Sequence, residues 1–443
     1  MFVSDNCIIT KSGVHYQRNR EKYILCELKF QSTKNKGIAE KMSVLAINGG
    51  SPVFGEKNIA DYMPQWPIPH PETEEKLIKL YRSGQWGMCS EYEQKLIAAY
   101  AEYQGTKHSI WMTNGTVTLE CALLALGIGP GDEVIVPGIS WLATAEAPIY
   151  VGATPVIVDV DPDTICIDPK KIEEAITPRT KAIIPVHLYS ALADMPAIMD
   201  IAKRHGLYVI EDCAHAHGTK QKGKGIGSYG EVGSFSFQLS KLMTAGEGGC
   251  CTTDSDELCD KIHRLSHIGS SRMFPGTTPD PSLLCHQYRF TDFQALIIYD
   301  QLAHQKELFE KRQQNAKLFS EMIKDVPGIM LQKSSYDDDD RGYYFVSWLL
   351  KLDELHEGVD RAMIMAALAA EGLPLGTGWG TPLYKHRIWN IPETMYVKHD
   401  TPNCEDIMYK RVMTRSHSFL LSPAEALEKS AEAIRKVMNE YAG

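Results

Sequence analysis

The chain has 443 residues and a mass of 49.5 kDa, with 44% hydrophobic and 23% charged residues, which is typical of a folded protein with several domains. Forty-six Lys and Arg against 56 Asp and Glu give a formal net charge of -10, so we expect no nucleic-acid partner, because phosphate would be repelled. No stretch approaches the roughly 18 apolar residues of a membrane span, and the mean hydropathy is -0.23, so we expect a soluble chain without a membrane partner.

The cysteines and the N-terminal segment indicate the cellular compartment of the protein. None of the eleven cysteines forms a C-x2-C pair of the zinc type, which predicts reduced thiols in a cytoplasmic protein. Residues 1–41 contain eight Lys or Arg and four Asp or Glu but no continuous apolar core, so no export signal is predicted. We expect residues 1–41 to be an N-terminal extension, either a mobile arm or a stretch upstream of the true start.

The first elements predicted after this extension are two helices. Apolar residues recur at helical spacing from about 72 to 103, and the run SGQWG at 83–87 interrupts them with a loop.

From residue 109 onward, short β-like runs alternate with helical runs of about ten residues. The predicted strands are SIWMT (109–113), EVIVP (133–137), TPVIVDV (154–160), KAIIPVHL (181–188) and LYVIEDC (207–213). The predicted helices cover 119–126, 142–151, 169–175 and 196–205. This alternation predicts an α/β fold with a mainly parallel sheet that is covered by helices on both faces.

Beyond residue 230 the pattern changes. Strand-like GSFSF (233–237) and CCTT (250–253) flank the glycine-rich AGEGG (245–249), and a long helix is predicted over 293–322. We expect a large domain over 42–305 and a small C-terminal α+β domain over 306–443. The loop SSYDDDDRG (334–342) is expected to be a solvated surface loop, with cation binding as the less favoured alternative.

Candidate functional residues follow the predicted strands, because ligands collect beyond the carboxyl ends of a parallel sheet. Asn114-Gly115-Thr116 begins a helix, whose free N–H groups favour a phosphate, although a plain turn with a helix cap is an alternative. Trp141 could cover a planar cofactor or lie in the core, and Glu211-Asp212 at a strand end invites a charged partner.

The remaining candidates lie in SFSFQLSKLMTAGEGG, which contains Ser236 and Lys241. A buried amine has a lowered pKa and can form a Schiff base with a carbonyl compound, whereas an isolated lysine is usually solvated. A phosphate cradle, an aromatic lid, a carboxylate and such a lysine on one sheet edge are the parts that pyridoxal 5'-phosphate requires.

The segments EDCAHAHG (211–218) and GSFSFQLSKLMTAGEGG (233–249) resemble the DegT/StrS family of sugar aminotransferases. The resemblance runs from about LAINGGSPVF (45–54) to the C-terminus and includes TNGTVTLECALLALGIGPGDEVIVP, SWLATAEA and PVHLYSALADM in the family's order. It implies the fold-type-I architecture of pyridoxal-phosphate-dependent transferases, a homodimer with active sites at its interface, and pyridoxal phosphate as cofactor with pyridoxamine phosphate as intermediate.

The resemblance also implies roles for individual residues. Lys241 would hold the cofactor aldehyde, Asp212 would pair with the pyridine nitrogen, and His215 would lie near the ring hydroxyl. Trp141 would stack on the ring, and the phosphate would be held by Gly115, Thr116 and Ser236. Gln287 stands where relatives have an Asn that reaches the phosphate across the dimer, so this contact is left open.

Other segments indicate which reaction and which substrates to expect within the family. WPIPHPE (66–72), GQWGM (84–88), FSFQ and KLMTAGEGG are most similar to enzymes that aminate keto-cyclitols of the scyllo-inosose type in aminoglycoside pathways, and to 3-amino-5-hydroxybenzoate synthases. Lys241 favours transamination, because related dehydratases have His at this position. We therefore expect an aminotransferase with glutamine or glutamate as donor and a keto-sugar or keto-cyclitol as acceptor. Because Ser190 and GWGTPLYKHRIW (378–389) depart from the family pattern, the acceptor could also differ.

Several alternatives remain at this stage. The enzyme could act on a nucleotide-linked keto-sugar, or catalyse elimination or aromatisation as a benzoate synthase does. His187, His215, His217 and Cys213 could form the zinc site of a hydrolase, which would leave Lys241 unexplained. A silent scaffold of the same fold is also conceivable, although the joint presence of Lys241, Asp212 and Ser236 disfavours it.

Overall fold

The computed structural model describes residues 9–10, 13–14, 44–87, 90–271, 284–337 and 339–443. The chain divides into two units, Met1–Met42 and Ser43–Gly443. In the first unit, β1 (Ile9–Thr10) pairs antiparallel with β2 (Gly13–Val14). The rest of the predicted N-terminal extension lies outside the described residues.

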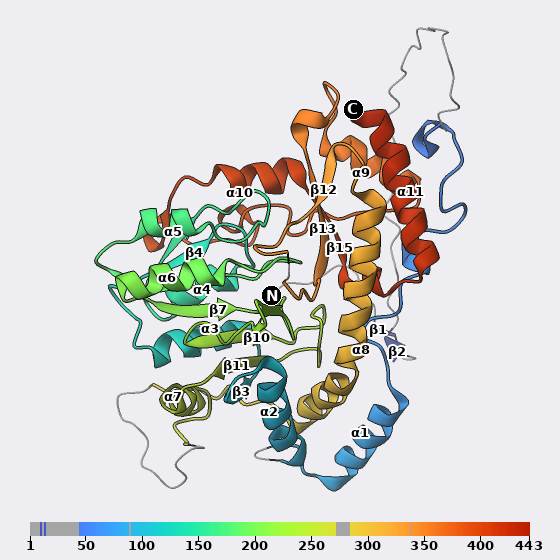
Figure 1. Cartoon of the computed structure of the whole chain (residues 1–443). Helices are drawn as coiled ribbons and strands as arrows, with labels where there is room; N and C mark the ends of the chain where they lie inside the picture. Colours follow the sequence, from blue (N-terminus) through green and yellow to red (C-terminus); the bar gives the residue numbers. More distant parts are fainter. Residues whose placement is uncertain (1–8, 11–12, 15–43, 88–89, 272–283, 338) are drawn as a thin grey trace, which may run out of the picture. The chain divides into compact units, whose positions relative to one another are not determined.

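The centre of the second unit is an eight-stranded sheet with the order β14-β5-β4-β6-β7-β10-β11-β3 (Figure 1). Its strands are β3 (His108–Met112), β4 (Glu133–Pro137), β5 (Thr154–Val158), β6 (Thr180–Ile183), β7 (Tyr208–Asp212), β10 (Val232–Ser236), β11 (Gly249–Thr253) and β14 (Val397–Lys398). Only β11 runs antiparallel to both of its neighbours, so the sheet is mainly parallel. The predicted α/β class is confirmed.

Helices cover both faces of this sheet because its strands are apolar on both sides. Val134 and Val136 of β4 face one core, which also contains residues of α3 (Gly115–Ala125), α4 (Ala143–Tyr150) and α7 (Asp256–Ser266). Ile135 faces the opposite core. That core contains residues of α2 (Glu91–Gln104), α5 (Pro169–Ala175), α6 (Met195–His205) and the first part of α8 (Asp292–Ile323).

A smaller antiparallel sheet lies in the C-terminal part. It has the order β12 (Ile329–Leu331), β13 (Phe345–Leu350) and β15 (Val412–Ser416). A third core buries Trp348 and Phe419 against Phe319 of α8, with α9 (Arg361–Ala370) and α11 (Ala424–Tyr441) around them. The helix α8 therefore joins two cores, and the predicted domain boundary between residues 305 and 306 falls inside it.

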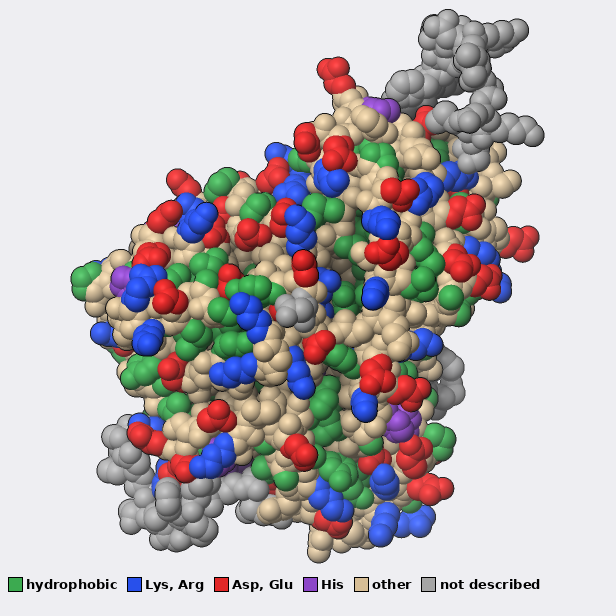
Figure 2. Space-filling model, in the orientation of Figure 1, with side chains coloured by type: hydrophobic (Ala, Val, Ile, Leu, Met, Phe, Trp, Pro, Cys, Tyr) green, Lys and Arg blue, Asp and Glu red, His purple; other side chains and the backbone are tan. Residues whose placement is uncertain are grey.

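The second unit also contains α1 (Pro71–Ser83), the short helix α10 (Pro402–Asp406) and the hairpin of β8 (Lys220–Gln221) and β9 (Lys224–Gly225). None of the helices in the described ranges combines the length and the apolar character needed to cross a bilayer. On the face shown in Figure 2, acidic and basic side chains are interspersed.

Two local expectations differ from the structure. The strand predicted over 181–188 ends at Ile183, because Pro185 has no N–H to continue the ladder. The loop 334–342 is not fully solvated, since Asp339 is buried. Its Oδ2 accepts hydrogen bonds from Ser334 Oγ at 2.6 Å and from the Tyr336 amide at 3.2 Å, which folds the loop onto itself. Asp338 lies outside the described residues.

Candidate active site

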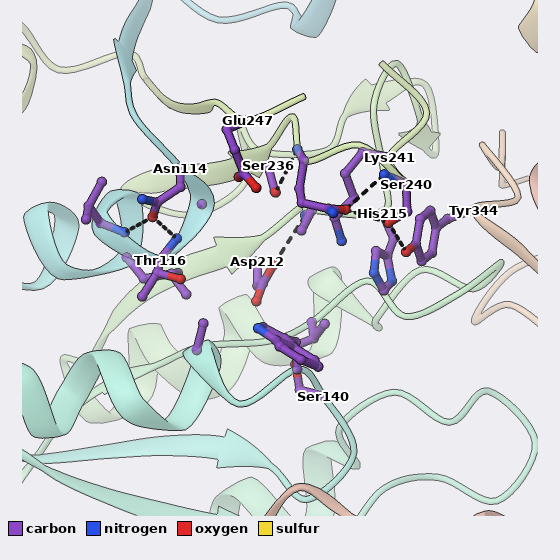
Figure 3. A pocket seen from close by; sticks show the side chains of 18 of the residues that line it. Asn114, Thr116, Ser140, Asp212, His215, Ser236, Ser240, Lys241, Glu247 and Tyr344 are labelled. Carbon is purple, nitrogen blue, oxygen red and sulfur yellow. Dashed lines mark hydrogen bonds between the residues drawn. The ribbon is translucent and has the colours of Figure 1, made fainter. Parts of the chain in front are cut away.

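A cavity of about 720 Å³ lies at the carboxyl ends of β3, β4, β7 and β10 (Figure 3). Its lining contains every predicted site residue except Gln287: Gly115, Thr116, Trp141, Asp212, His215, Ser236 and Lys241. These residues come from segments that are distant in the sequence. They meet here because the parallel strands that they follow share one carboxyl edge.

The phosphate side of the cavity is formed where α3 begins against the end of β10. Asn114 caps α3, because its Oδ1 accepts hydrogen bonds from the amides of Thr116 at 3.0 Å and Val117 at 3.1 Å. A Cβ on Gly115 would lie 2.8 Å from the Cβ of Ser236, so only glycine allows this close approach. The helix N-terminus and the Ser236 hydroxyl thus lie together, which suits a bound phosphate.

The carboxylate at the end of β7 is held in place by hydroxyl and amide donors. Asp212 is buried, and its Oδ2 accepts a hydrogen bond from Thr144 Oγ1 at 2.8 Å, while its Oδ1 accepts one from the Ala214 amide at 3.2 Å. The Ser140 and Thr144 hydroxyl oxygens are 2.6 Å apart. Burial raises the pKa of Asp212, and the hydrogen bond from Thr144 opposes this rise. A cationic ring nitrogen in the cavity would favour the ionised carboxylate.

Lys241 lies beside the aromatic ring of Tyr344. Its Nζ is 4.6 Å from the ring centroid, and the Tyr344 hydroxyl is 2.8 Å from Ser240 Oγ. Burial lowers the pKa of Lys241 to about 8, and the charge of Asp212 opposes this shift. At about pH 7.5 a group with this pKa is roughly one quarter neutral, so a nucleophilic amine is available near neutrality.

The two histidines that follow β7 have different surroundings. The ring of His215 stacks on Tyr344 at 3.9 Å and lines the cavity, and its Nδ1 accepts the Tyr189 amide at 3.2 Å. Burial lowers the pKa of His215 well below its usual value, so the ring is neutral and its Nε2 carries the hydrogen. His217 instead donates from Nε2 to the Ser236 carbonyl at 2.9 Å, which supports the phosphate side from behind.

Trp141 is 46% exposed at the cavity wall, so it is not a core residue. Its ring centroid is 6.4 Å from that of Trp379 and 5.9 Å from that of His386. The alternative of a buried core tryptophan is therefore wrong.

Among the lining residues that were not singled out from the sequence are Gln238, Glu247, Tyr344 and Trp379. Gln238 and Glu247 flank Lys241 in the same segment, so the motif itself could have indicated them. Tyr344 precedes β13 and Trp379 follows α9, and no local pattern connects either residue with the sheet edge.

Gln287 lies outside the cavity lining and is exposed. Its Oε1 accepts a hydrogen bond from the Arg289 amide at 3.2 Å. A contact with the phosphate of a partner subunit stays a prediction.

The four residues of the alternative zinc site do not form one cluster. His187 Nε2 donates to Glu211 Oε2 at 3.3 Å, and its Nδ1 accepts the Ala193 amide at 3.2 Å. Within the described ranges, His187 groups with Glu211 and Cys213, but not with His215 or His217. The proposed set of four ligands is therefore not brought together.

The cavity fits pyridoxal phosphate by its chemistry. It offers an anion site that a Cβ on Gly115 would fill, a buried carboxylate, an aromatic wall and an amine with a lowered pKa. These are the groups that bind the phosphate, the ring nitrogen, the ring face and the aldehyde of this cofactor.

Comparison with known proteins agrees with this chemistry. Residues 68–429 match the model of the DegT/DnrJ/EryC1/StrS aminotransferase family. The L-glutamine:2-deoxy-scyllo-inosose aminotransferases of Streptoalloteichus tenebrarius and Streptomyces paromomycinus are 35% and 36% identical to the chain, and each match covers 90% of this chain and 98% of the relative. The crystal structure of 3-amino-5-hydroxybenzoic acid synthase is similar with a TM-score of 0.76 and 28% identity, over 85% of this chain and 99% of that chain.

Proposed function

Because the chain belongs to the DegT/DnrJ/EryC1/StrS aminotransferase family, we propose that it transfers the amino group of glutamine to a keto-cyclitol of the scyllo-inosose type. The enzyme is a pyridoxal-phosphate-dependent aminotransferase with the fold-type-I architecture. The observation that carries the proposal is the presence of both Lys241 and Asp212 in the lining of one cavity. Relatives that are 35% and 36% identical over almost their whole length are named for this donor and acceptor.

The cofactor would be held by residues from four strand ends. The α3 N-terminus with Gly115 and Thr116, together with Ser236, would bind the phosphate. Asp212 would hold the proton of the ring nitrogen, His215 would donate to the ring hydroxyl, and Trp141 would cover one face of the ring. When bound, the cofactor supplies an aldehyde that carries the amino group and a ring that withdraws electrons.

Lys241 would move the proton in both halves of the reaction. Its Nζ would take a proton from the α-carbon of the donor and return one at the carbon that receives nitrogen. The lowered pKa of about 8 provides the neutral amine that this step needs. Tyr344 and Ser240 restrict the position of the lysine, which keeps it close to the reacting carbon.

The small number of cationic side chains in the cavity lining favours an acceptor without phosphate groups. Lys241 is the one Lys or Arg among the lining residues that the structure describes. A nucleotide diphosphate is usually bound by several cationic side chains, so a nucleotide-linked sugar is less well matched. Glu247, Gln238 and Trp379 instead offer hydrogen-bonding groups and an apolar face for a polyol ring.

The active enzyme would be a homodimer with its active sites at the interface. Ile268 and Leu284 are 59% and 81% exposed, and the Ile268 amide donates to the His286 carbonyl at 2.9 Å, next to Gln287. Exposed apolar side chains at this place are expected where a second subunit packs.

A cytoplasmic location is supported by the cysteines. Free thiols are buried at Cys121, Cys166, Cys213, Cys250, Cys251 and Cys404, as is usual in a reducing compartment.

Spectra of the purified enzyme with pyridoxal phosphate test the cofactor chemistry. We expect an absorbance band near about 410 to 430 nm that shifts to about 330 nm when glutamine is added. Lys241→Ala should lack the band, whereas the exposed control Lys203→Ala should keep it. A band that persists in Lys241→Ala would refute the role of this lysine.

Product analysis tests the substrates. The enzyme is incubated with scyllo-inosose or 2-deoxy-scyllo-inosose and with glutamine or glutamate in parallel. Formation of the amino-cyclitol with glutamine supports the proposal. The similarity to 3-amino-5-hydroxybenzoic acid synthase favours one other candidate, an aromatising elimination, which would instead give an aromatic product from its own substrate.

A further inference from the structure

We propose that His70, Glu72 and His304 bind a zinc ion outside the catalytic cavity. Their ligand atoms all lie within 4.8 Å of one another. His70 and Glu72 are at the start of α1, and His304 is on α8, so the ion would join two elements that are far apart in the sequence. Histidine is visible at the surface where α1 adjoins α8 in Figure 2.

The distances are close to those of a zinc site. Glu72 Oε1 is 3.3 Å from His304 Nε2 and 3.9 Å from His70 Nδ1. Zinc–ligand bonds of about 2.0 to 2.1 Å in a tetrahedron place ligand atoms about 3.3 to 3.4 Å apart. Of the three edges between ligand atoms, the one from Glu72 to His304 already fits and the one from Glu72 to His70 must shorten by about half an ångström. The edge between the two histidines is within 4.8 Å, and side-chain rotation adjusts both of these edges.

The two imidazole rings stack face to face, so one ring must turn about its Cβ–Cγ bond before the in-plane lone pairs of both can point at one ion. Their centroids are 3.9 Å apart and their planes differ by 1°. Two histidines and one glutamate form a ligand set that zinc uses in proteins, with the fourth position left to water.

The surrounding contacts hold the two helices in place without an ion. Asp300, one turn before His304 on α8, accepts hydrogen bonds from Lys76 Nζ at 2.7 Å and Thr73 Oγ1 at 2.9 Å, both on α1. The His70 carbonyl accepts the Thr73 amide at 3.0 Å. The ligands are therefore presented by a preformed frame.

The charge of the cluster also favours a cation. In the described part of the chain, the ion pairs of Glu72 are with His70 and His304, and none is with Lys or Arg. The nearby Lys76 is bound to Asp300 instead. By contrast, Glu173 contacts His205 at 3.2 Å and is also neutralised by Arg204. A divalent ion would add a positive charge beside this exposed carboxylate.

The same part of α8 supports the loop that carries Lys241. Gln301 Oε1 accepts the Thr244 amide at 3.0 Å, and Gln305 Nε2 donates to the Leu242 carbonyl at 3.2 Å. An ion at His304 would therefore stabilise the frame behind this loop without touching the reactants.

Zinc binding to the untagged holoenzyme, first treated with a chelator, tests the proposal. Equilibrium dialysis should give one zinc per chain in the wild type and in the control His205→Ala, which removes a histidine from a glutamate pair that already contains arginine. His304→Gln and Glu72→Gln should bind zinc about tenfold more weakly or worse. Zinc should raise the unfolding temperature of the wild type by about 2 to 5 °C but not that of His304→Gln.

Cobalt substitution identifies the ligands independently. Visible bands of four-coordinate cobalt with nitrogen and oxygen ligands, lost in His304→Gln, would support the site. Unchanged zinc binding in both variants, thiolate bands in the cobalt spectrum, or no bound zinc in the wild type would overturn it.

Discussion

Gly115→Ala tests the phosphate cradle most directly. The new Cβ would lie 2.8 Å from the Cβ of Ser236 and 3.3 Å from its Cα and Oγ. Carbon atoms prefer separations of about 3.5 to 4.0 Å, so the start of α3 must move away by roughly 1 Å. Ser236 cannot yield instead, because it is paired with Gly249 of β11 in the centre of the sheet.

This movement has a predictable effect on cofactor affinity. A shift of roughly 1 Å breaks hydrogen bonds of about 2.8 Å between the helix start and a phosphate. Each charge-assisted bond contributes about 1.5 to 3 kcal/mol, so each one lost weakens binding between about tenfold and 150-fold. The strain of the added methyl group should also lower the free energy of unfolding by about 1 to 3 kcal/mol.

Titration of the apoenzyme with pyridoxal phosphate, followed by absorbance, measures the affinity, and urea unfolding measures the stability. Gly129→Ala is the matched control, since a Cβ there would meet only the Val151 carbonyl, at an ordinary 3.5 Å. If Gly115→Ala binds the cofactor as tightly as the wild type, the proposed position of the phosphate is incorrect.

Three further outcomes are expected. Asp212→Asn should lower kcat/KM by roughly 10² to 10⁴-fold while still binding the cofactor, because an amide cannot keep the ring nitrogen protonated; steady-state kinetics and absorbance titration check both points. The pKa of Lys241 is about 8, and only the neutral amine attacks an aldehyde. The rate at which the apoenzyme takes up the cofactor should therefore rise as the pH increases through about 8 and then level off. A stopped-flow rate that stays constant from about pH 7 to 9 would contradict this. Glu371→Gln should lower the free energy of unfolding by about 2 to 4 kcal/mol, because the buried carboxylate accepts hydrogen bonds from Ala46 N at 2.8 Å and Lys436 Nζ at 2.9 Å. Urea unfolding measures this loss, which should be much smaller for Glu321→Gln, since Glu321 forms an exposed ion pair with Lys324.

The sheet could be predicted because its strands are short apolar runs separated by helical spacing. EVIVP is buried along its whole length in β4, as expected for a strand between two layers of helices. The edge strand β14 could not be predicted, since two exposed residues carry no periodicity. The apolar run from Leu119 marks only part of α3, because the helix begins at Gly115, directly after its cap at Asn114.

The cofactor side of the site could be predicted, but the opposite wall could not. Asp212 and Ser236 end strands, so the shared carboxyl edge of a parallel sheet places them together. Tyr344 and Trp379 come from the C-terminal part, and their approach to the cavity depends on packing between elements that are distant in the sequence. Local patterns contain no information about such packing.

This division of the cavity wall has an evolutionary consequence. Trp379 comes from the C-terminal part, whereas Asp212 ends β7, so on the proposed assignment selection can change the acceptor side beside Trp379 while the carboxylate that serves the chemistry stays in place. Laboratory libraries aimed at new amino-cyclitols should therefore vary the C-terminal loops and leave the sheet edge intact.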